Sequence, residues 1–296
     1  MIVDTSIVFG LASLTFAGVK DVVLKRQATR CSGSGTYIAI VGTVWMLFFS
    51  LFGLSQGSLP VHSVLKLGLI AGTFSVSADY LLIRSLRDLD AGFAVTIYRL
   101  NLVPAALMAV ILLAEPFSLL KAFGLIAGVI AVILFCGNRN GHPHKIHLST
   151  GALICVVSAS LFRACMGIVY KVASDSYTSL ASGGIDCHQA WFLGLQGAMW
   201  LVGGTLVSFG EGRPRWTKDD VITGVITGLL ICGTVLFLAK ALAIGQAVVI
   251  IAISQMSFLV TAFLSWLFMK EHFSTRKTIG LACAIIAIIL LSIATE

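Results

Sequence analysis

Charged residues are scarce in this chain. Asp, Glu, Lys and Arg make up 11% of its 296 residues, whereas hydrophobic residues make up 58%. A soluble domain normally has about a quarter of its residues charged. The shortage excludes a soluble fold of this size, and the mean hydropathy of +0.99 indicates that the chain lies in a bilayer.

Several familiar signals are also missing. The seven cysteines show no CxxC spacing, so we interpret them as small buried hydrophobic side chains. The first residues, MIVDTS, contain no basic segment and no small-residue cleavage site, so the first apolar stretch is expected to be retained as a helix. The net charge of +7 comes from basic residues between apolar stretches, which indicates membrane orientation and not nucleic-acid binding.

Long apolar stretches are what the chain does contain. A transmembrane helix needs about 20 mostly apolar residues. Ten stretches meet this requirement: 4–25, 35–55, 64–86, 91–113, 119–137, 149–173, 187–209, 219–243, 246–269 and 276–294. The sequence therefore predicts an all-α membrane protein with ten transmembrane helices.

An internal repeat divides these helices into two sets. The segment EPFSLLKAFGL at 115–125 returns as EHFSTRKTIGL at 271–281, an offset of 156 positions (271 minus 115). The match continues without a gap from Leu82 and Leu238 to Leu134 and Leu290. Earlier helices match at smaller offsets, as in these pairs: Phe16/Phe162, Lys25/Lys171 and Trp45/Trp200. We therefore predict two five-helix repeats, residues 1–145 and 146–296.

An odd number of helices in each repeat has a topological consequence. The two repeats must enter the membrane from opposite sides, which is the inverted arrangement of many secondary transporters, with the substrate site between the repeats near mid-membrane. The loops on the side reached after the first helix contain 13 Lys and Arg residues, against 4 on the other side. The positive-inside rule places the first side in the cytoplasm and both termini outside.

Ionisable residues inside the predicted helices are the first candidates for a site, because each costs roughly 2.5–3.5 kcal/mol on insertion scales. Asp79 and Arg99 lie ten residues before and after Leu89, so they reach a similar depth in neighbouring helices. We predict an ion pair between them, which either fixes the packing of the helices or lines the transport cavity. In the first helix, Lys20 is expected to have a structural or orienting role. Asp21 is interpreted either as a structural residue or as a residue that couples transport.

Further polar residues gather at the same level. Arg163, near the middle of the sixth helix, is interpreted as a clamp for an anionic group, with an ion pair to Asp21 or Asp79 as the alternative. Beside Arg99 lie two polar residues, and the second repeat has polar residues at the matching positions: Tyr98 and Asn101, then Gln255 and Ser257. These residues predict an asymmetric substrate cavity, charged on one side and neutral on the other.

Other motifs favour structural roles. Glu115 and Glu271 recur at helix ends, which suits structure better than proton coupling. The HxHxxH loop of His142, His144 and His147 is interpreted as solvated, and no metal or cofactor is predicted. Three GxxxG pairs are expected to pack helices within the molecule, with a dimer face as the alternative: Gly68/Gly72, Gly124/Gly128 and Gly224/Gly228.

The repeated pattern from Glu115 to Gly124, and from Glu271 to Gly280, resembles the drug/metabolite transporter superfamily of the EamA type. In that family a Glu closes the fourth helix of each half, and a Gly opens the packing face of the fifth. Pro104 fits the family habit of a proline in the fourth helix, whereas Val260 departs from it. Phe16 stands where many members have Trp. Members usually have both termini in the cytoplasm, so the resemblance and the charge count leave the orientation open.

These observations favour a secondary transporter in the plasma or inner membrane that moves a small polar metabolite by alternating access. The two arginines indicate a carboxylate or phosphate, as in amino acids and organic anions. The alternatives are an exporter of cationic drugs, a membrane enzyme acting on lipid-linked substrates, and a structural or receptor subunit. Expected partners are the substrate, membrane lipids, and either protons or a counter-substrate, in a monomer or a homodimer that binds no nucleic acid.

Overall fold

The computed structural model describes residues 4–28, 34–56, 62–86, 88–89, 91–136, 150–176, 187–212, 217–269 and 274–294. Its helices in chain order are α1 (Thr5–Ala28), α2 (Ser34–Ser55), α3 (His62–Ser85), α4 (Ala91–Arg99), α5 (Leu102–Leu113), α6 (Leu119–Cys136), α7 (Thr150–Ser176), α8 (Cys187–Gly210), α9 (Lys218–Ile244), α10 (Ala247–Ser254), the 3-10 helix η2 (Gln255–Ser257), α11 (Phe258–Met269) and α12 (Thr275–Ile293).

The helices confirm the predicted membrane spans. Within the described ranges, nine helical segments are long and apolar enough to cross a bilayer, and a shorter apolar helix covers Leu119–Phe135. The outer ends of every predicted span lie within three residues of the observed ones. Two predicted spans are interrupted, because α4 and α5 form one span and α10, η2 and α11 form another.

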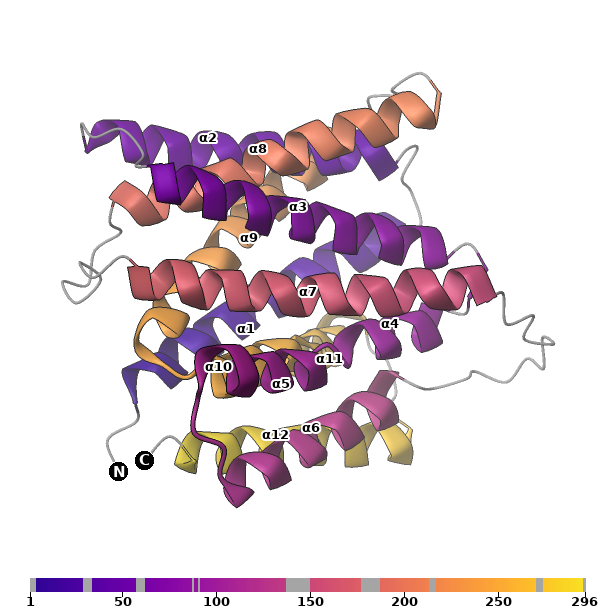
Figure 1. Ribbon diagram of the computed structural model, residues 1–296. Coiled ribbons are helices and arrows are strands. Elements are labelled where there is room, and N and C mark those ends of the chain that lie inside the picture. The colour runs from indigo at the N-terminus through magenta and orange to yellow at the C-terminus, as the bar shows by residue number, and fades with distance from the viewer. Residues whose placement is uncertain are drawn as a thin grey trace.

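The two repeats interlock instead of standing apart (Figure 1). The most extensive contacts join equivalent helices, α2 with α8 and α6 with α12. The next most extensive contacts join α1 with α9 and α7 with α3. The repeat relates these two pairs to each other, because α7 is the equivalent of α1 and α3 is the equivalent of α9. The contacts therefore follow a two-fold relation between the halves. Because each repeat has five spans, α7 runs opposite to α1, and both chain ends lie at the same end of the bundle.

Small residues allow this interlocking. At Gly42 an added Cβ would lie 2.4 Å from the backbone nitrogen of Leu201, and at Gly197 it would lie 2.3 Å from that of Met46, so α2 and α8 touch backbone to backbone. The GxxxG pairs also meet side chains within the molecule; an added Cβ at Gly72, for example, would lie 2.7 Å from Met199. The prediction of intramolecular packing is confirmed, as expected where small residues let membrane helices approach closely.

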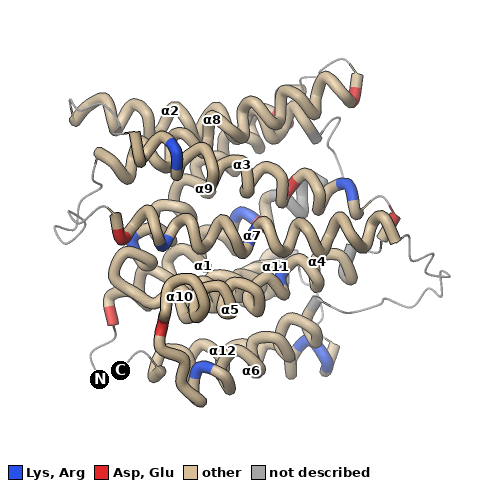
Figure 2. Tube along the Cα trace, in the orientation of Figure 1, with Lys and Arg blue, Asp and Glu red and all other residues tan. Residues whose placement is uncertain are grey.

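The outer surface of the bundle is largely apolar along the lengths of the helices. Large side chains point outward along the helices, including Ile111 at 74% exposed and Leu119 at 79% exposed. Patches of this extent on a soluble monomer would be unusual, whereas a bilayer suits them. Most charged positions lie near helix ends, and a few interrupt the central helices (Figure 2). Those few central charges locate the candidate site.

Candidate substrate site

The site is built where two membrane spans break. In the first half the break lies between Arg99 and Leu102, and in the second half it covers Gln255 to Ser257. The two breaks occupy equivalent positions, since the repeat offset of 156 takes Arg99 to Gln255. Pro104 explains the first break, because it has no N–H and its ring excludes a regular turn before it. The second break forms without proline, at Met256 with φ −86° and ψ 17°.

The Arg99 side chain connects the two breaks through hydrogen bonds. Its Nη1 donates to the Gln255 carbonyl oxygen at 2.8 Å and to the Ser257 hydroxyl at 3.0 Å. A carbonyl at a helix break lacks its usual amide donor and is costly to bury unpaired, so the guanidinium satisfies it. Asn101 Nδ2 adds a bond of 3.3 Å to Gln255 Oε1. Four residues of the predicted cavity thus meet across the repeat interface.

The carboxylate that Arg99 contacts belongs to Asp21. Arg99 Nη2 lies 2.9 Å from Asp21 Oδ2, and Lys20 Nζ lies 3.3 Å from Asp21 Oδ1. The predicted ion pair between Arg99 and Asp79 is wrong. Asp79 Oδ1 instead accepts a hydrogen bond from the Tyr98 hydroxyl at 3.2 Å. Neighbouring residues on a helix point about 100° apart, so Tyr98 faces α3 while Arg99 faces α1 and η2.

Arg163 on α7 is the least satisfied cation of the cluster. Its Nη1 donates to Met166 Sδ at 3.5 Å, and thioether sulfur is a weak acceptor. No described carboxylate lies within ion-pair distance of its guanidinium, so the alternative ion pair with Asp21 or Asp79 does not form. Asp79, Tyr98 and Asp21 interact with it electrostatically at longer range. Arg163 is therefore free to bind an external acceptor.

The cluster carries an excess of positive charge. Lys20, Arg99 and Arg163 contribute three cations, and Asp21 and Asp79 contribute two carboxylates. The side chains are only partly covered, with 15% of Arg99 and 21% of Asp21 exposed. A charged group inside a membrane protein needs a partner or water. One uncompensated cation in a partly exposed polar cluster is suited to an anionic ligand.

A buried polar pair near this cluster was not predicted from the sequence. The Tyr170 hydroxyl of α7 lies 2.7 Å from Gln196 Oε1 of α8, and both side chains are fully buried. A lone amide in an apolar span is expensive to bury, so Gln196 was a usable signal. The indole of Trp200 on α8 donates to the Ser75 hydroxyl of α3 at 2.9 Å.

Glu115 lies at the other end of its span, away from this cluster. Its carboxylate accepts hydrogen bonds from the backbone amides of Ala247 at 2.6 Å and Val248 at 3.1 Å. These are the first amides of α10, which have no partner within the helix, and the negative charge also suits the positive end of the helix dipole. Glu115 therefore caps a helix of the other repeat. Glu271 and the histidine loop lie outside the described residues.

Comparisons with known proteins agree with this architecture. The model of the EamA-like transporter family matches residues 4–137 and 150–293, one repeat each. No curated protein matches the chain. A solved structure titled "Crystal structure of protein" superposes with a TM-score of 0.78 at 13% identity, covering 98% of this chain and 97% of its own. That likeness extends to the fold alone, whereas the family match spans nearly all of both halves. The chain is a multi-pass membrane protein and belongs to the EamA-like transporter family.

Proposed function

We propose that the chain is a secondary transporter of a small polar metabolite that carries a carboxylate or a phosphate. The observation that carries the proposal is Arg163, a guanidinium inside the bundle whose one close acceptor among the described residues is a sulfur atom. Its planar donors match the two oxygens of a carboxylate or the oxygens of a phosphate. Asp79 and Tyr98 lie within its electrostatic reach and would orient the remainder of the substrate.

Alternating access is supported by a difference between equivalent helices. Every residue of α10 from Ala247 to Ile253 is at most 5% exposed, so the bundle is closely packed around this helix. In α4, the equivalent helix, Phe93 is 39% exposed, and Tyr98 and Arg99 are partly exposed. In an inverted repeat, α4 can take up the packed surroundings that α10 has now, while α10 takes up the more open surroundings of α4. This exchange closes the substrate site to one side of the membrane and opens it to the other. The structure would then represent a state open at the α4 end.

The coupling partner is a separate part of the proposal. Asp21, Glu115 and Glu271 are the carboxylates assigned to coupling from the sequence, and that role stays a prediction. Asp21 is already held by Lys20 and Arg99, and Glu115 by α10. A counter-substrate that competes for Arg163 is therefore better supported than a proton carried by these groups. We place the protein in the plasma or inner membrane, as a monomer or a homodimer.

A ligand screen followed by a transport assay tests the proposal. Amino acids, organic acids, sugar phosphates and quaternary ammonium compounds are added to purified protein, and thermal shifts are recorded. We expect only anionic or zwitterionic compounds to stabilise it. Loss of charge-assisted bonds in Arg163→Gln removes about 1.5–3 kcal/mol, or roughly ten- to a hundredfold in affinity. Counterflow in proteoliposomes should fall accordingly.

The matched control is Arg276→Gln, which removes an exposed guanidinium at the start of α12. This variant should bind and transport as the unmodified protein does. Stabilisation by quaternary ammonium compounds alone, unchanged in Arg163→Gln, would favour a cation exporter centred on Asp79. Equal affinity for anions in both variants would remove Arg163 from the substrate site.

A further inference from the structure

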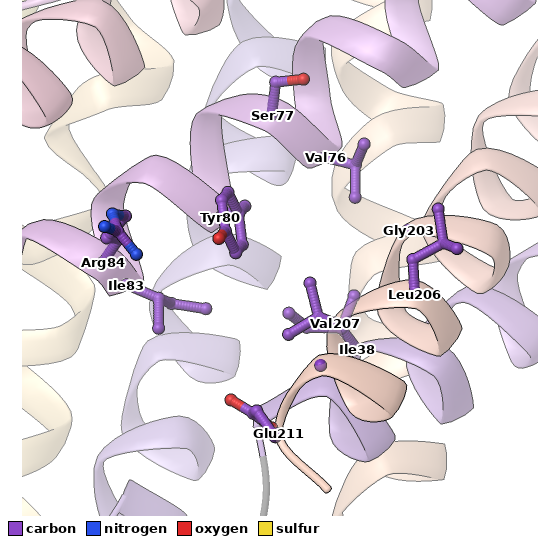
Figure 3. A pocket seen from close by; sticks show the side chains of 11 residues that line it. Ile38, Val76, Ser77, Tyr80, Ile83, Arg84, Gly203, Leu206, Val207 and Glu211 are labelled. Carbon is purple, nitrogen blue, oxygen red and sulfur yellow. The ribbon is translucent and has the colours of Figure 1, made fainter.

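A cavity lies apart from the polar cluster, at the end of the bundle where α3 and α8 both end. Its volume is about 490 Å³, and we call it the α3–α8 groove. Its lining includes Val76, Tyr80 and Arg84 on α3, Leu206 and Gly210 on α8, and Glu211 directly after α8 (Figure 3). The two helices diverge toward this end (Figure 1).

The sequence of each helix explains the groove. Val76, Tyr80 and Arg84 are four residues apart, so they lie on one face of α3. Asp79, which bonds to Tyr98 of α4, points about 100° away from Tyr80, so the groove and the substrate site use different sides of α3. On α8, an added Cβ at Gly210 would meet no atom within 4 Å. Missing side-chain volume at this position keeps the groove open.

The surroundings of the groove are those of a lipid-facing surface. Leu206 on its wall is 67% exposed and the nearby Phe209 is 72% exposed, both in an apolar membrane span. In a bilayer such side chains contact acyl chains. Tyr80 presents a ring with a hydroxyl, a combination favoured at the boundary between hydrocarbon and head groups. The groove thus runs from the hydrocarbon region toward a membrane face.

Arg84 supplies the polar end of the groove. It lies in the last turn of α3, next to the end of the membrane span His62–Ser85, and its side chain is exposed. No described carboxylate forms an ion pair with it. An exposed guanidinium above an apolar trough matches a phosphate joined to an acyl chain, since guanidinium and phosphate form paired hydrogen bonds. Glu211, at the same end of the groove, is already engaged by the protein, since its carboxylate accepts a hydrogen bond from the Gly35 amide at 3.1 Å (Figure 3).

We propose that the α3–α8 groove binds one phospholipid, with its phosphate on Arg84 and an acyl chain along Val76 and Leu206. This bound lipid is distinct from the transported substrate, so the site stands or falls independently of the proposed transport function.

Native mass spectrometry of the full chain in detergent tests this site. The probes are phosphatidylethanolamine, phosphatidylglycerol and diacylglycerol with the same acyl chains, of which the last has no phosphate. We expect one saturable site for each of the two phospholipids and no tight retention of diacylglycerol. Arg84→Gln should lower the affinity about tenfold or more. Gly210→Phe fills the groove without a clash at Cβ and should also abolish the tight site.

Arg276→Gln serves as the control, because it removes another exposed arginine at the same end of the bundle. It should retain the lipid, and Arg84→Lys should restore part of the affinity as a point charge. If Gly210→Phe does not fold, the comparison of Arg84→Gln with Arg276→Gln decides alone. Equal retention of diacylglycerol, or equal loss in both arginine variants, would show only an annulus of nonspecific lipid and overturn the proposal.

Discussion

At the scale of single residues, the contacts of the Arg99 guanidinium determine how the site is assembled. Its guanidinium contacts Asp21 on α1 and the Gln255 carbonyl on η2, so one side chain links both repeats. Depth along the membrane was not sufficient to predict this pairing. Asp79 has the matching depth, but the direction in which Arg99 leaves α4 is set by the neighbouring Tyr98, which faces α3. Direction around the helix axis decided the partner.

A double-mutant cycle distinguishes the two partners. Asp21→Asn and Arg99→Gln should couple by about 1–2 kcal/mol in the free energy of unfolding, since they remove one charge-assisted hydrogen bond. Asp79→Asn and Arg99→Gln should be additive within about 0.5 kcal/mol. Both cycles can be measured by chemical denaturation of purified protein in detergent. A larger coupling for the Asp79 pair would contradict the observed geometry.

Close packing at Gly18 gives a second residue-scale prediction. An added Cβ there would lie 2.8 Å from the Ser257 carbonyl oxygen and 2.5 Å from Val260 Cβ, at the break itself. Gly18→Ala should therefore destabilise the protein by about 1–3 kcal/mol through overpacking. At Gly10, on the same helix, the nearest atoms lie 3.6 Å away, so Gly10→Ala should be neutral or stabilising. Similar melting temperatures for both variants would show that α1 is not closely packed against the break at Gly18.

At the scale of elements, the two broken spans are the main feature that hydropathy did not reveal. A window of apolar residues continues through the breaks, because Leu100 and Met256 are themselves apolar. Pro104 pointed to the first break, but Val260 in the equivalent position gave no such signal. The second break is stabilised by tertiary contacts, namely the bonds from Arg99 to Gln255 and Ser257. Local sequence patterns cannot predict such a contact between residues of different repeats.

Proline scanning of α11 tests whether the second break is permanent. Val260 is the third residue of α11, and the first amides of a helix have no partner within it. Val260→Pro should therefore cost less than about 1 kcal/mol, as proline is tolerated in a first turn. Leu264→Pro, four residues further on, should cost about 3 kcal/mol or more. Equal and large losses of thermal stability would indicate a continuous helix at Val260.

The cap on α10 is an element-scale contact whose loss can be measured directly. Glu115→Ala removes the acceptor for two amides at the start of α10 and should lower the free energy of unfolding by about 0.5–2 kcal/mol. Glu115→Gln retains one oxygen acceptor and loses the charge, so its effect should be smaller. Thermal melts of both variants provide the comparison. A greater loss in the glutamine variant would argue against capping.

At the scale of the whole molecule, most of the architecture could be predicted and most of the site geometry could not. The offset that relates Glu115 to Glu271 predicted the two repeats, and hydropathy predicted the spans to within three residues. Asn101, Gln255 and Ser257 were correctly grouped with Arg99, because repeat symmetry places equivalent positions near one axis. The role of Glu115 could not be predicted, because the α10 amides it caps are 132 residues away in sequence.

Paired distances at the two ends of the bundle test the central claim most directly. Spin labels at Asp88 and Phe268 report on the α4 end, and labels at Leu112 and Ile244, their repeat equivalents, report on the α10 end. All four positions are exposed. Double electron–electron resonance on each pair, with and without a stabilising ligand from the screen, gives both distance distributions. Alternating access predicts opposite changes, so that the α4 end closes as the α10 end opens. Two ends that widen together, or neither end changing under transport conditions, would contradict it.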